Sequence, residues 1–367
     1  MIYLDNAATT EIFKEVVSEY TDSIENFPGN PSSSHQMGKK AAARFTELRE
    51  KVKKLLSIGD THEVIFASGS VGNNAVVSEI SSDEGITVCG ILEHPSIYKP
   101  VTELPKNSVI KCNREGLYDL DELANVLKEE KVDLVSLMLV SNELGCRQNV
   151  EKAAELISLL SPSSRFHVDA SQGISYMTWP QSIENIDFIT MSAHKFHGPV
   201  GSGILICRKN SVKSFFVKGG EQQTLISGTI NLHGAAATVR ALELTLRRRN
   251  DEFLELCSYT SEKLGKVKDL EFTVSKDNRV PWIFSISLPG LRGEIIARAM
   301  DMKNIAISWS SACGSSKGGL SRSLKSVGAR MDRGYVRVAV SVMNTKDEID
   351  VFITELQSVV EKYAILD

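Results

Sequence analysis

A lysine, two histidines and a serine lie close together in the stretch MSAHKFHGP, directly after a run of apolar residues. These side chains are Ser192, His194, Lys195 and His197. A lysine at the end of a buried strand can form a Schiff base with an aldehyde, while a serine and a histidine beside it can hold a phosphate. A surface turn that carries a lysine by chance explains the motif equally well when it is taken alone.

A carboxylate occupies a similar place in the stretch FHVDASQG, where Asp169 ends another apolar run and Gln172 follows it. A carboxylate there can face a pyridinium nitrogen and keep it protonated, so that the ring acts as an electron sink. The ordinary alternative is an aspartate that caps the next helix.

Small residues form a third motif, ASGSVGNNA, between a strand-like run and a helical pattern. The residues from Ser68 to Asn73, among them Ser70, can expose backbone N–H groups to a phosphate at a helix N-terminus. The motif is weak alone, and it is not a dinucleotide fingerprint because GxGxxG is absent.

Together the three motifs specify a ligand with a phosphate, a ring nitrogen and an aldehyde, which is pyridoxal phosphate. Three further side chains agree with this interpretation. His94 in EHPSIY can stack on the ring, Asn142 in SNELG can bond the ring hydroxyl, and Arg337 in YVRVAVS can grip a carboxylate with two parallel hydrogen bonds. Singly, each is more simply a turn histidine, a capping asparagine or a surface arginine.

Alternating strands and helices must position these motifs. Short β-branched runs predict buried strands at residues 63–68, 86–92, 132–140, 165–170, 186–192 and 203–208. Helical spacing at 45–56 and 150–160 separates some of them. This alternation predicts an α/β domain with a mainly parallel sheet, in which ligands bind beyond the carboxyl ends of the strands.

The pattern changes after about residue 232. One long helical stretch leads into fewer strands, at 282–288, 305–309 and 335–341. The last helix is expected from about Lys346 to Lys362, with Thr345 as its N-cap. This part is predicted to be a smaller α+β domain.

Composition excludes several classes of protein. A net charge of −4 predicts no general attraction to nucleic acid or to an anionic membrane, and no apolar run is long enough for a membrane span. The N-terminus does not resemble a signal peptide. The six cysteines are scattered, which predicts neither a metal site nor a disulfide framework and fits a reducing cytoplasm. Cys89 and Cys207 lie in apolar runs and are expected to be buried and inert, whereas Cys313 lies among small residues in SWSSACGSSKGGLSR.

The chain resembles the NifS-like cysteine desulfurases, a group of class V aminotransferases among the fold-type I pyridoxal phosphate enzymes. The resemblance extends almost end to end through YLDNAATT, GNPSSSHQMG, EHPSIY, SNELG, HVDASQ, SAHKFHGP, SGT, SSACGSS and VRVAVS. It implies a large domain at 13–250 with a mainly parallel seven-stranded sheet. A small α+β domain would comprise 1–12 and 251–367 and carry the cysteine loop.

The resemblance also implies a role for each matching residue. Lys195 would be the Schiff-base lysine and proton shuttle, His94 would stack on the ring, and Cys313 would accept sulfur from L-cysteine as a persulfide. The other implied cofactor contacts are Asp169 at the ring nitrogen, Gln172 and Asn142 at the ring oxygen, and Ser192, His194, Ser70 and Val71 at the phosphate. Thr229 would reach the phosphate of the partner subunit, which implies a homodimer with shared sites, and Arg337, Asn6 and Ala7 would bind substrate.

Some positions depart from the family pattern. Val71 and Gly72 replace a threonine and a glutamate, Ile226 replaces an arginine, and Trp309 replaces a small residue. The chain ends at Asp367, without the longer tail that relatives use to dock an iron–sulfur scaffold. The sulfur acceptor is therefore open, with iron–sulfur assembly, tRNA thiolation and a thiamin-pathway carrier as alternatives. A cysteine, cystine or selenocysteine lyase, or a non-catalytic partner protein, also stays open as the function.

Overall fold

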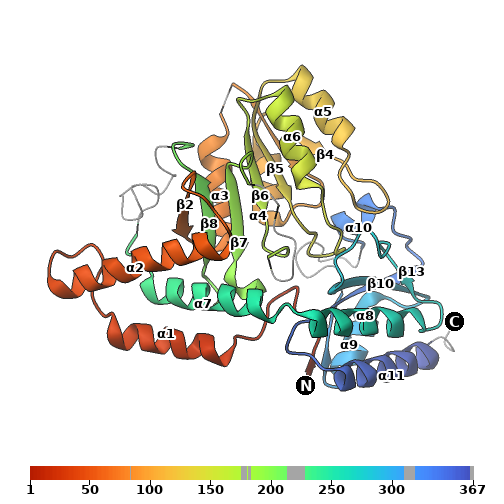
Figure 1. The fold of residues 1–367 in the computed structure, drawn as a ribbon. Helices are drawn as coiled ribbons and strands as arrows, with labels where there is room; N and C mark the ends of the chain where they lie inside the picture. The colour runs from red at the N-terminus through yellow and green to blue at the C-terminus, as the bar shows by residue number, and fades with distance from the viewer. Residues whose placement is uncertain (83, 175–179, 181–182, 213–227, 310–318, 364–367) are drawn as a thin grey trace.

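The computed structural model describes residues 1–82, 84–174, 180, 183–212, 228–309 and 319–363. Figure 1 shows a large central sheet with helices on both faces and a smaller sheet covered by helices at one end. The N-terminus and the last described helix, α11 (Lys346–Tyr363), lie at this smaller part. The division at residues 12/13 and 250/251 stays a prediction.

The central sheet has seven strands in the order β2-β8-β7-β6-β5-β3-β4. The strands are β2 (His62–Phe66), β3 (Ile86–Gly90), β4 (Asn107–Ile110), β5 (Val132–Met138), β6 (Arg165–Asp169), β7 (Phe188–Ser192) and β8 (Gly203–Arg208). β8 runs antiparallel to both of its neighbours, and the pairs from β7 to β4 are all parallel. The predicted mainly parallel α/β sheet is therefore confirmed, and each of the six predicted strands is present. The strand at 203–208 has the predicted bounds, the first strand begins one residue earlier and ends two residues earlier than predicted, and the other four are slightly shorter.

Alternating side chains along these strands bury two apolar faces. Ile65 and Leu205 belong to a core under α3 (Gly69–Ile80) and α4 (Pro95–Glu103). Their neighbours Val64 and Ile206 belong to the main core on the other face. Among the helices that contribute to this main core are α2 (Gln36–Leu55), α5 (Leu120–Glu129), α6 (Val150–Leu160) and α7 (Leu232–Arg248). α1 (Lys14–Asn26) packs on the outside of α7.

The smaller part is built on a four-stranded antiparallel sheet in the order β12-β13-β10-β9. Its strands are β9 (Glu271–Phe272), β10 (Ile283–Pro289), β12 (Ser308–Trp309) and β13 (Arg333–Ala339). The helices of this part are α8 (Asp251–Gly265), α9 (Gly293–Asp301), α10 (Arg322–Ser326) and α11. The N-terminal strand β1 (Ile2–Tyr3) pairs in parallel with β11 (Ile305–Ala306), so the first residues of the chain belong to this end of the molecule.

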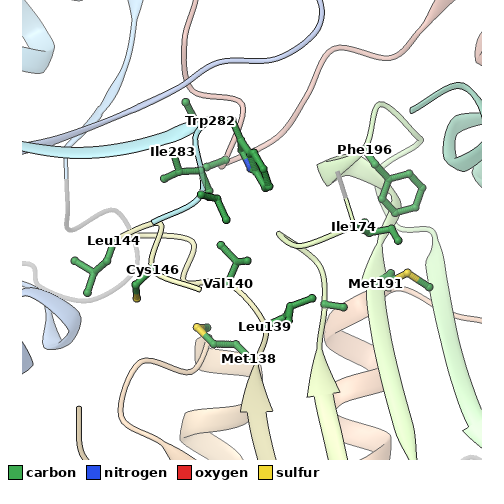
Figure 2. Packing of buried hydrophobic residues seen from close by; sticks show 14 of the residues in the cluster. Met138, Leu139, Val140, Leu144, Cys146, Ile174, Met191, Phe196, Trp282 and Ile283 are labelled. Carbon is green, nitrogen blue, oxygen red and sulfur yellow. The ribbon is translucent and has the colours of Figure 1, made fainter. Parts of the chain in front are cut away.

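The main core is continuous between the two parts. Figure 2 shows Met138, Leu139 and Val140 at the carboxyl end of β5 and, close by, Trp282 and Ile283 at the start of β10. All five are buried members of the main core cluster. The edge of the large sheet at which β5 ends is thus held against the small sheet by apolar packing.

Two predictions from the second half of the chain are wrong in detail. The long helical stretch is broken into α7 and α8, because Asn250 takes an extended conformation and its side chain accepts a hydrogen bond from the Phe253 N–H. The run 305–309 is not one strand: Ile305 pairs with Ile2, whereas Trp309 pairs with Val336 in another sheet.

The predicted cap of the last helix is confirmed. The Glu348 N–H donates to Thr345 Oγ1 over 3.2 Å, and the Thr345 N–H donates to Glu348 Oε2 over 3.1 Å. This reciprocal pair is a capping box, which satisfies two of the orphan donors at the helix start.

Candidate functional site

The carboxyl ends of three parallel strands bring the predicted residues together. Met138 on β5, Asp169 on β6 and Thr190 on β7 lie side by side in register. Lys195 follows β7 in a single 3-10 turn, Ala193–Lys195. Because all three strands end at the same edge, the polar residues that follow them meet there.

Lys195 is anchored to the N-terminal segment of the chain. Its Nζ donates to the Ala7 carbonyl over 2.8 Å and to the Ala8 carbonyl over 2.6 Å. Gln172 Nε2 donates to the same Ala7 carbonyl over 2.8 Å. Ala7 from the start of the chain therefore lies beside Gln172 and Lys195 from its middle, all three being predicted site residues. Ala7 and Gln172 are buried.

Asp169 is buried and both of its oxygens accept hydrogen bonds. Asn73 Nδ2 donates to Oδ2 over 2.9 Å, and the Ser171 N–H donates to Oδ1 over 3.0 Å. These bonds fix the orientation of the carboxylate. The interpretation as a simple helix cap is wrong, because no helix begins here among the described residues and the long-range partner comes from α3.

His94 is the N-cap of α4 and lies near the same carboxylate. Its Nδ1 accepts from the Ser96 N–H over 3.2 Å. Burial lowers the pKa of His94, the Asp169 carboxylate opposes this shift, and the Lys195 ammonium adds to it. His94 is therefore a neutral imidazole at pH 7, within electrostatic reach of both other groups.

The start of α3 lies beside the end of β7. The side chain of the N-cap Ser68 accepts no hydrogen bond from the first turn of α3. The backbone N–H groups of that turn are therefore left for another acceptor. Gly69 sits so close to Ser192 that a Cβ there would lie 2.0 Å from Ser192 Oγ. His194 Nδ1 lies 3.3 Å from Thr9 Oγ1. Burial lowers the pKa of His194 to about 4, so His194 can offer a neutral hydrogen bond but not a charge.

Other predicted positions in this region differ in exposure. Ser70 is exposed, and Val71 has 43% of its surface exposed on the first turn of α3. Thr229 is exposed and makes no hydrogen bond to these groups in the described part of the chain. Trp309 on β12 is half-buried against the main core. Cys313 and Ile226 lie outside the described residues.

Arg337 comes from the small sheet and lies near the carboxyl ends of the large sheet's strands. It is buried on β13, its Nη2 is 2.7 Å from Asp5 Oδ1, and its Nη1 donates to the Asn142 carbonyl over 2.7 Å. The Arg337 Nε is buried and has no partner among the described atoms. Asn6, which follows Asp5, donates instead to the Ala339 carbonyl over 2.8 Å. Arg337 is therefore a buried cation with a donor to spare, not a surface arginine.

Several residues in this cluster escaped the sequence analysis as individual site residues. Asn73, Ser96, Thr9 and Thr190 contact Asp169, His94, His194 or one another. The only signal for Asn73 was its place in the small-residue motif before α3. Thr9 stands in the N-terminal AATT, and no spacing rule connects it to His194, 185 residues away.

The chain belongs to the aminotransferase class-V family, which it matches over residues 2–352. It is 31% identical to a cysteine desulfurase of Sinorhizobium fredii, an alignment that covers 98% of this chain and 97% of the relative. It is 30% identical to a NifS/IcsS protein homolog of Lactobacillus delbrueckii subsp. bulgaricus, over 99% and 98% of the two chains. A solved NifS-like protein from Rickettsia africae superimposes with a TM-score of 0.88 at 26% identity, over 98% and 99% of the chains.

This membership makes the protein a pyridoxal phosphate-dependent enzyme of the NifS-like kind. The residues present fit that cofactor. An amine, a buried carboxylate with fixed orientation and a neutral imidazole lie at one edge. The uncapped first turn of α3, where Gly69 lies close against the Ser192 side chain, supplies backbone donors for a phosphate.

Proposed function

We propose that this protein is a cysteine desulfurase, which removes the sulfur of L-cysteine to give L-alanine and a persulfide on Cys313. The observation that carries the proposal is the meeting of Lys195, Asp169 and His94 at the carboxyl edge of the large sheet, with Arg337 arriving from the small sheet. An amine, an anion, a neutral imidazole and a buried cation are the groups that an α-amino acid and pyridoxal phosphate require.

Each residue would have a distinct contact with the cofactor. Lys195 would hold its aldehyde carbon, Asp169 its ring nitrogen, and His94 the face of its ring. Asn142 and Gln172 would bind its ring oxygen, and its phosphate would lie against Ser192, His194, Ser70 and the first turn of α3 that includes Val71. When bound, pyridoxal phosphate supplies a conjugated ring that accepts electrons from the α-carbon of an amino acid.

The chain's own residues would carry out the proton and sulfur transfers. Arg337 would bind the substrate carboxylate, with Asn6 and Ala7 lining the same pocket. The Lys195 amine would take the proton from the α-carbon. The Cys313 thiolate would attack the substrate sulfur, so that an S–S bond forms and the Cβ–S bond breaks. Cβ gains a proton and is reduced as the sulfur is oxidised to the persulfide level, so the step needs no outside oxidant.

Product analysis with L-cysteine tests the proposal. The purified protein, loaded with pyridoxal phosphate and given a reducing thiol, is expected to release alanine and sulfide in equal amounts. Cys313→Ala is expected to abolish sulfide release while the visible absorbance of the cofactor is retained. Sulfide release that Cys313→Ala leaves unchanged would contradict the persulfide step.

A lyase is the second candidate function, and Val71 is the observation that favours it. An exposed valine offers no hydroxyl on the first turn of α3, so the proposed phosphate site differs from the family pattern. Pyruvate and ammonia in place of alanine would identify a cysteine or cystine lyase, and release of selenide in preference to sulfide would identify a selenocysteine lyase.

A homodimer with shared sites is also part of the proposal. Val17, Tyr20 and Ile24 are exposed on α1, and their spacing places them on one face of the helix. This apolar face and the exposed Thr229 support contact with a second copy of the chain. We expect light scattering to give twice the chain mass of 40.3 kDa, and a single-chain mass would contradict this part.

The sulfur acceptor is proposed to be a protein of iron–sulfur assembly, of tRNA thiolation or of the thiamin pathway, and a cytoplasmic location stays a prediction. No described helix is both long and apolar enough to cross a membrane. Incubating the persulfide form with purified scaffold proteins would identify the acceptor by the sulfur it receives.

A further inference from the structure

Asn73 connects two of the proposed cofactor contacts. Its side chain on α3 is only 2% exposed. Nδ2 lies 2.9 Å from Asp169 Oδ2 and 2.9 Å from Ser96 Oγ. Ser96 Oγ in turn lies 2.8 Å from His94 Nδ1. One hydrogen-bonded chain therefore runs from the carboxylate at the end of β6 to the imidazole at the start of α4.

The carboxylate determines the direction of the bonds that Asn73 makes in this chain, and the Ser96 N–H, which points at His94 Nδ1, determines the last one. Asp169 accepts at both oxygens, so the Asn73 atom that faces it must be the amide nitrogen. That nitrogen has two protons, and its second one faces Ser96 Oγ. The Ser96 oxygen thus accepts from Asn73, and its own proton is left for His94 Nδ1.

His94 Nδ1 is consequently an acceptor. It receives the Ser96 hydroxyl over 2.8 Å and the Ser96 N–H over 3.2 Å, which leaves no room for a proton of its own. The single proton of the neutral ring must then lie on Nε2. The lowering of the His94 pKa by burial agrees with a neutral ring.

A second branch leaves the other side of Asn73. The Thr190 hydroxyl donates to Asn73 Oδ1, so its oxygen accepts from His167 Nε2, 3.1 Å away. His167 Nδ1 then accepts from the Ser136 hydroxyl over 2.8 Å. His167 is fully buried, and burial lowers its pKa to about 4, so this ring is also neutral with its proton on Nε2.

We propose that Asn73 and Ser96 are positioning residues that transmit the orientation of the Asp169 carboxylate to His94 and hold His94 as a neutral imidazole with its proton on Nε2. The proposal rests on the proposed function only in treating Asp169 and His94 as cofactor contacts. Its consequence is that His94 meets a ligand in the site with an N–H donor and not with a lone pair, at a ring orientation set by α3.

Nitrogen NMR of the histidine rings tests the proposal without measuring activity. The full chain, labelled with ¹⁵N-histidine, is compared with and without pyridoxal phosphate, and the His94 signals are assigned by their loss in His94→Gln. We expect a pyridine-type Nδ1 and a pyrrole-type Nε2 for His94. Ser96→Ala removes the hydroxyl but keeps the Ser96 N–H, so it should move both signals part of the way toward the average of the two tautomers, and Ser96→Thr, which keeps the hydroxyl, should restore them.

Matched variants separate this effect from a general loss of structure. Thr102→Ala removes a hydroxyl from the same helix, where it bonds only main-chain carbonyls of α4, and should leave the His94 signals in place. Ser96→Ala should leave His167 unchanged, whereas Thr190→Val should alter His167. A proton on His94 Nδ1 in the wild type, or His94 signals that Ser96→Ala leaves unchanged, would overturn the proposal. Failure to release sulfide from L-cysteine would count against the proposed function alone, because the ring signals do not depend on turnover.

Discussion

Glu93 is a fully buried carboxyl one residue before His94. Its Oε1 accepts from the Tyr118 hydroxyl over 2.7 Å and from the Met138 N–H over 2.5 Å. Its Oε2 is buried with no partner in the described part of the chain. Burial raises the pKa of Glu93 to about 8, and the two donated hydrogen bonds only partly oppose this. A neutral carboxylic acid is thus retained beside the site at pH 7.

This carboxyl predicts a pH dependence of stability that Glu93→Gln should remove. The folded pKa of about 8 exceeds the ordinary glutamate value of 4.5, so the folded state binds more protons between these two values. The Glu93 contribution is therefore fully present below about pH 4.5 and is lost as the pH rises through 8. Urea unfolding at pH 5.5 and pH 8 should show a smaller decrease in the free energy of unfolding for Glu93→Gln than for the wild type.

Glu103→Gln is the control for this comparison, because Glu103 is exposed at the end of α4. It should follow the wild type at both pH values. Equal pH dependence in the wild type and Glu93→Gln would show that Glu93 is ionised in the folded protein at neutral pH.

The first turn of α3 packs closely on a neighbouring strand and is also the proposed phosphate site. Gly69 has no positive φ, so the close approach of Ser192, not backbone conformation, requires glycine here. Alanine would favour a helix over glycine by about 1 kcal/mol if space allowed. An alanine Cβ at this position would lie 2.0 Å from Ser192 Oγ, so the serine side chain would have to move, which reverses that expectation.

Gly69→Ala is accordingly expected to destabilise the fold by about 1–3 kcal/mol, as overpacking does. It should also weaken pyridoxal phosphate binding, measured by titrating the visible absorbance of the cofactor. Gly59→Ala is the matched control, since nothing lies within 4 Å of its Cβ position. If Gly69→Ala binds the cofactor as tightly as Gly59→Ala, the first turn of α3 does not hold the phosphate.

The elements themselves were largely predictable, and their contacts were not. Apolar and β-branched runs such as 203–208 predict strands from local sequence alone, and the Thr345–Glu348 spacing is a local capping signal. The break at Asn250 was missed because apolar helical spacing continues across it. The pairing of Asn73 with Asp169 depends on strand order and on side-chain rotamers 96 residues apart, for which no local pattern exists.

Arg337 joins three distant parts of the chain. It binds Asp5 in the N-terminal segment and the Asn142 carbonyl after β5, while its own strand belongs to the small sheet. Figure 1 shows the N-terminus at the small part of the molecule, consistent with the pairing of β1 and β11. The predicted carboxylate-binding arginine is therefore also a structural connection, and a test must separate the two roles.

Arg337→Lys is expected to raise the KM for L-cysteine about 10–100-fold with a smaller change in kcat, because a lysine cannot replace the two parallel hydrogen bonds of the guanidinium to a carboxylate. Arg333→Lys is the matched control. Arg333 is buried on the same strand, is paired with Glu271 over 3.1 Å, and donates to Ser287 Oγ over 2.8 Å. Both variants lose a buried guanidinium, so thermal unfolding should report a similar loss of stability. Only Arg337→Lys should change the KM, and an equal effect of both variants on the KM would mean that Arg337 acts through the fold and not through the substrate.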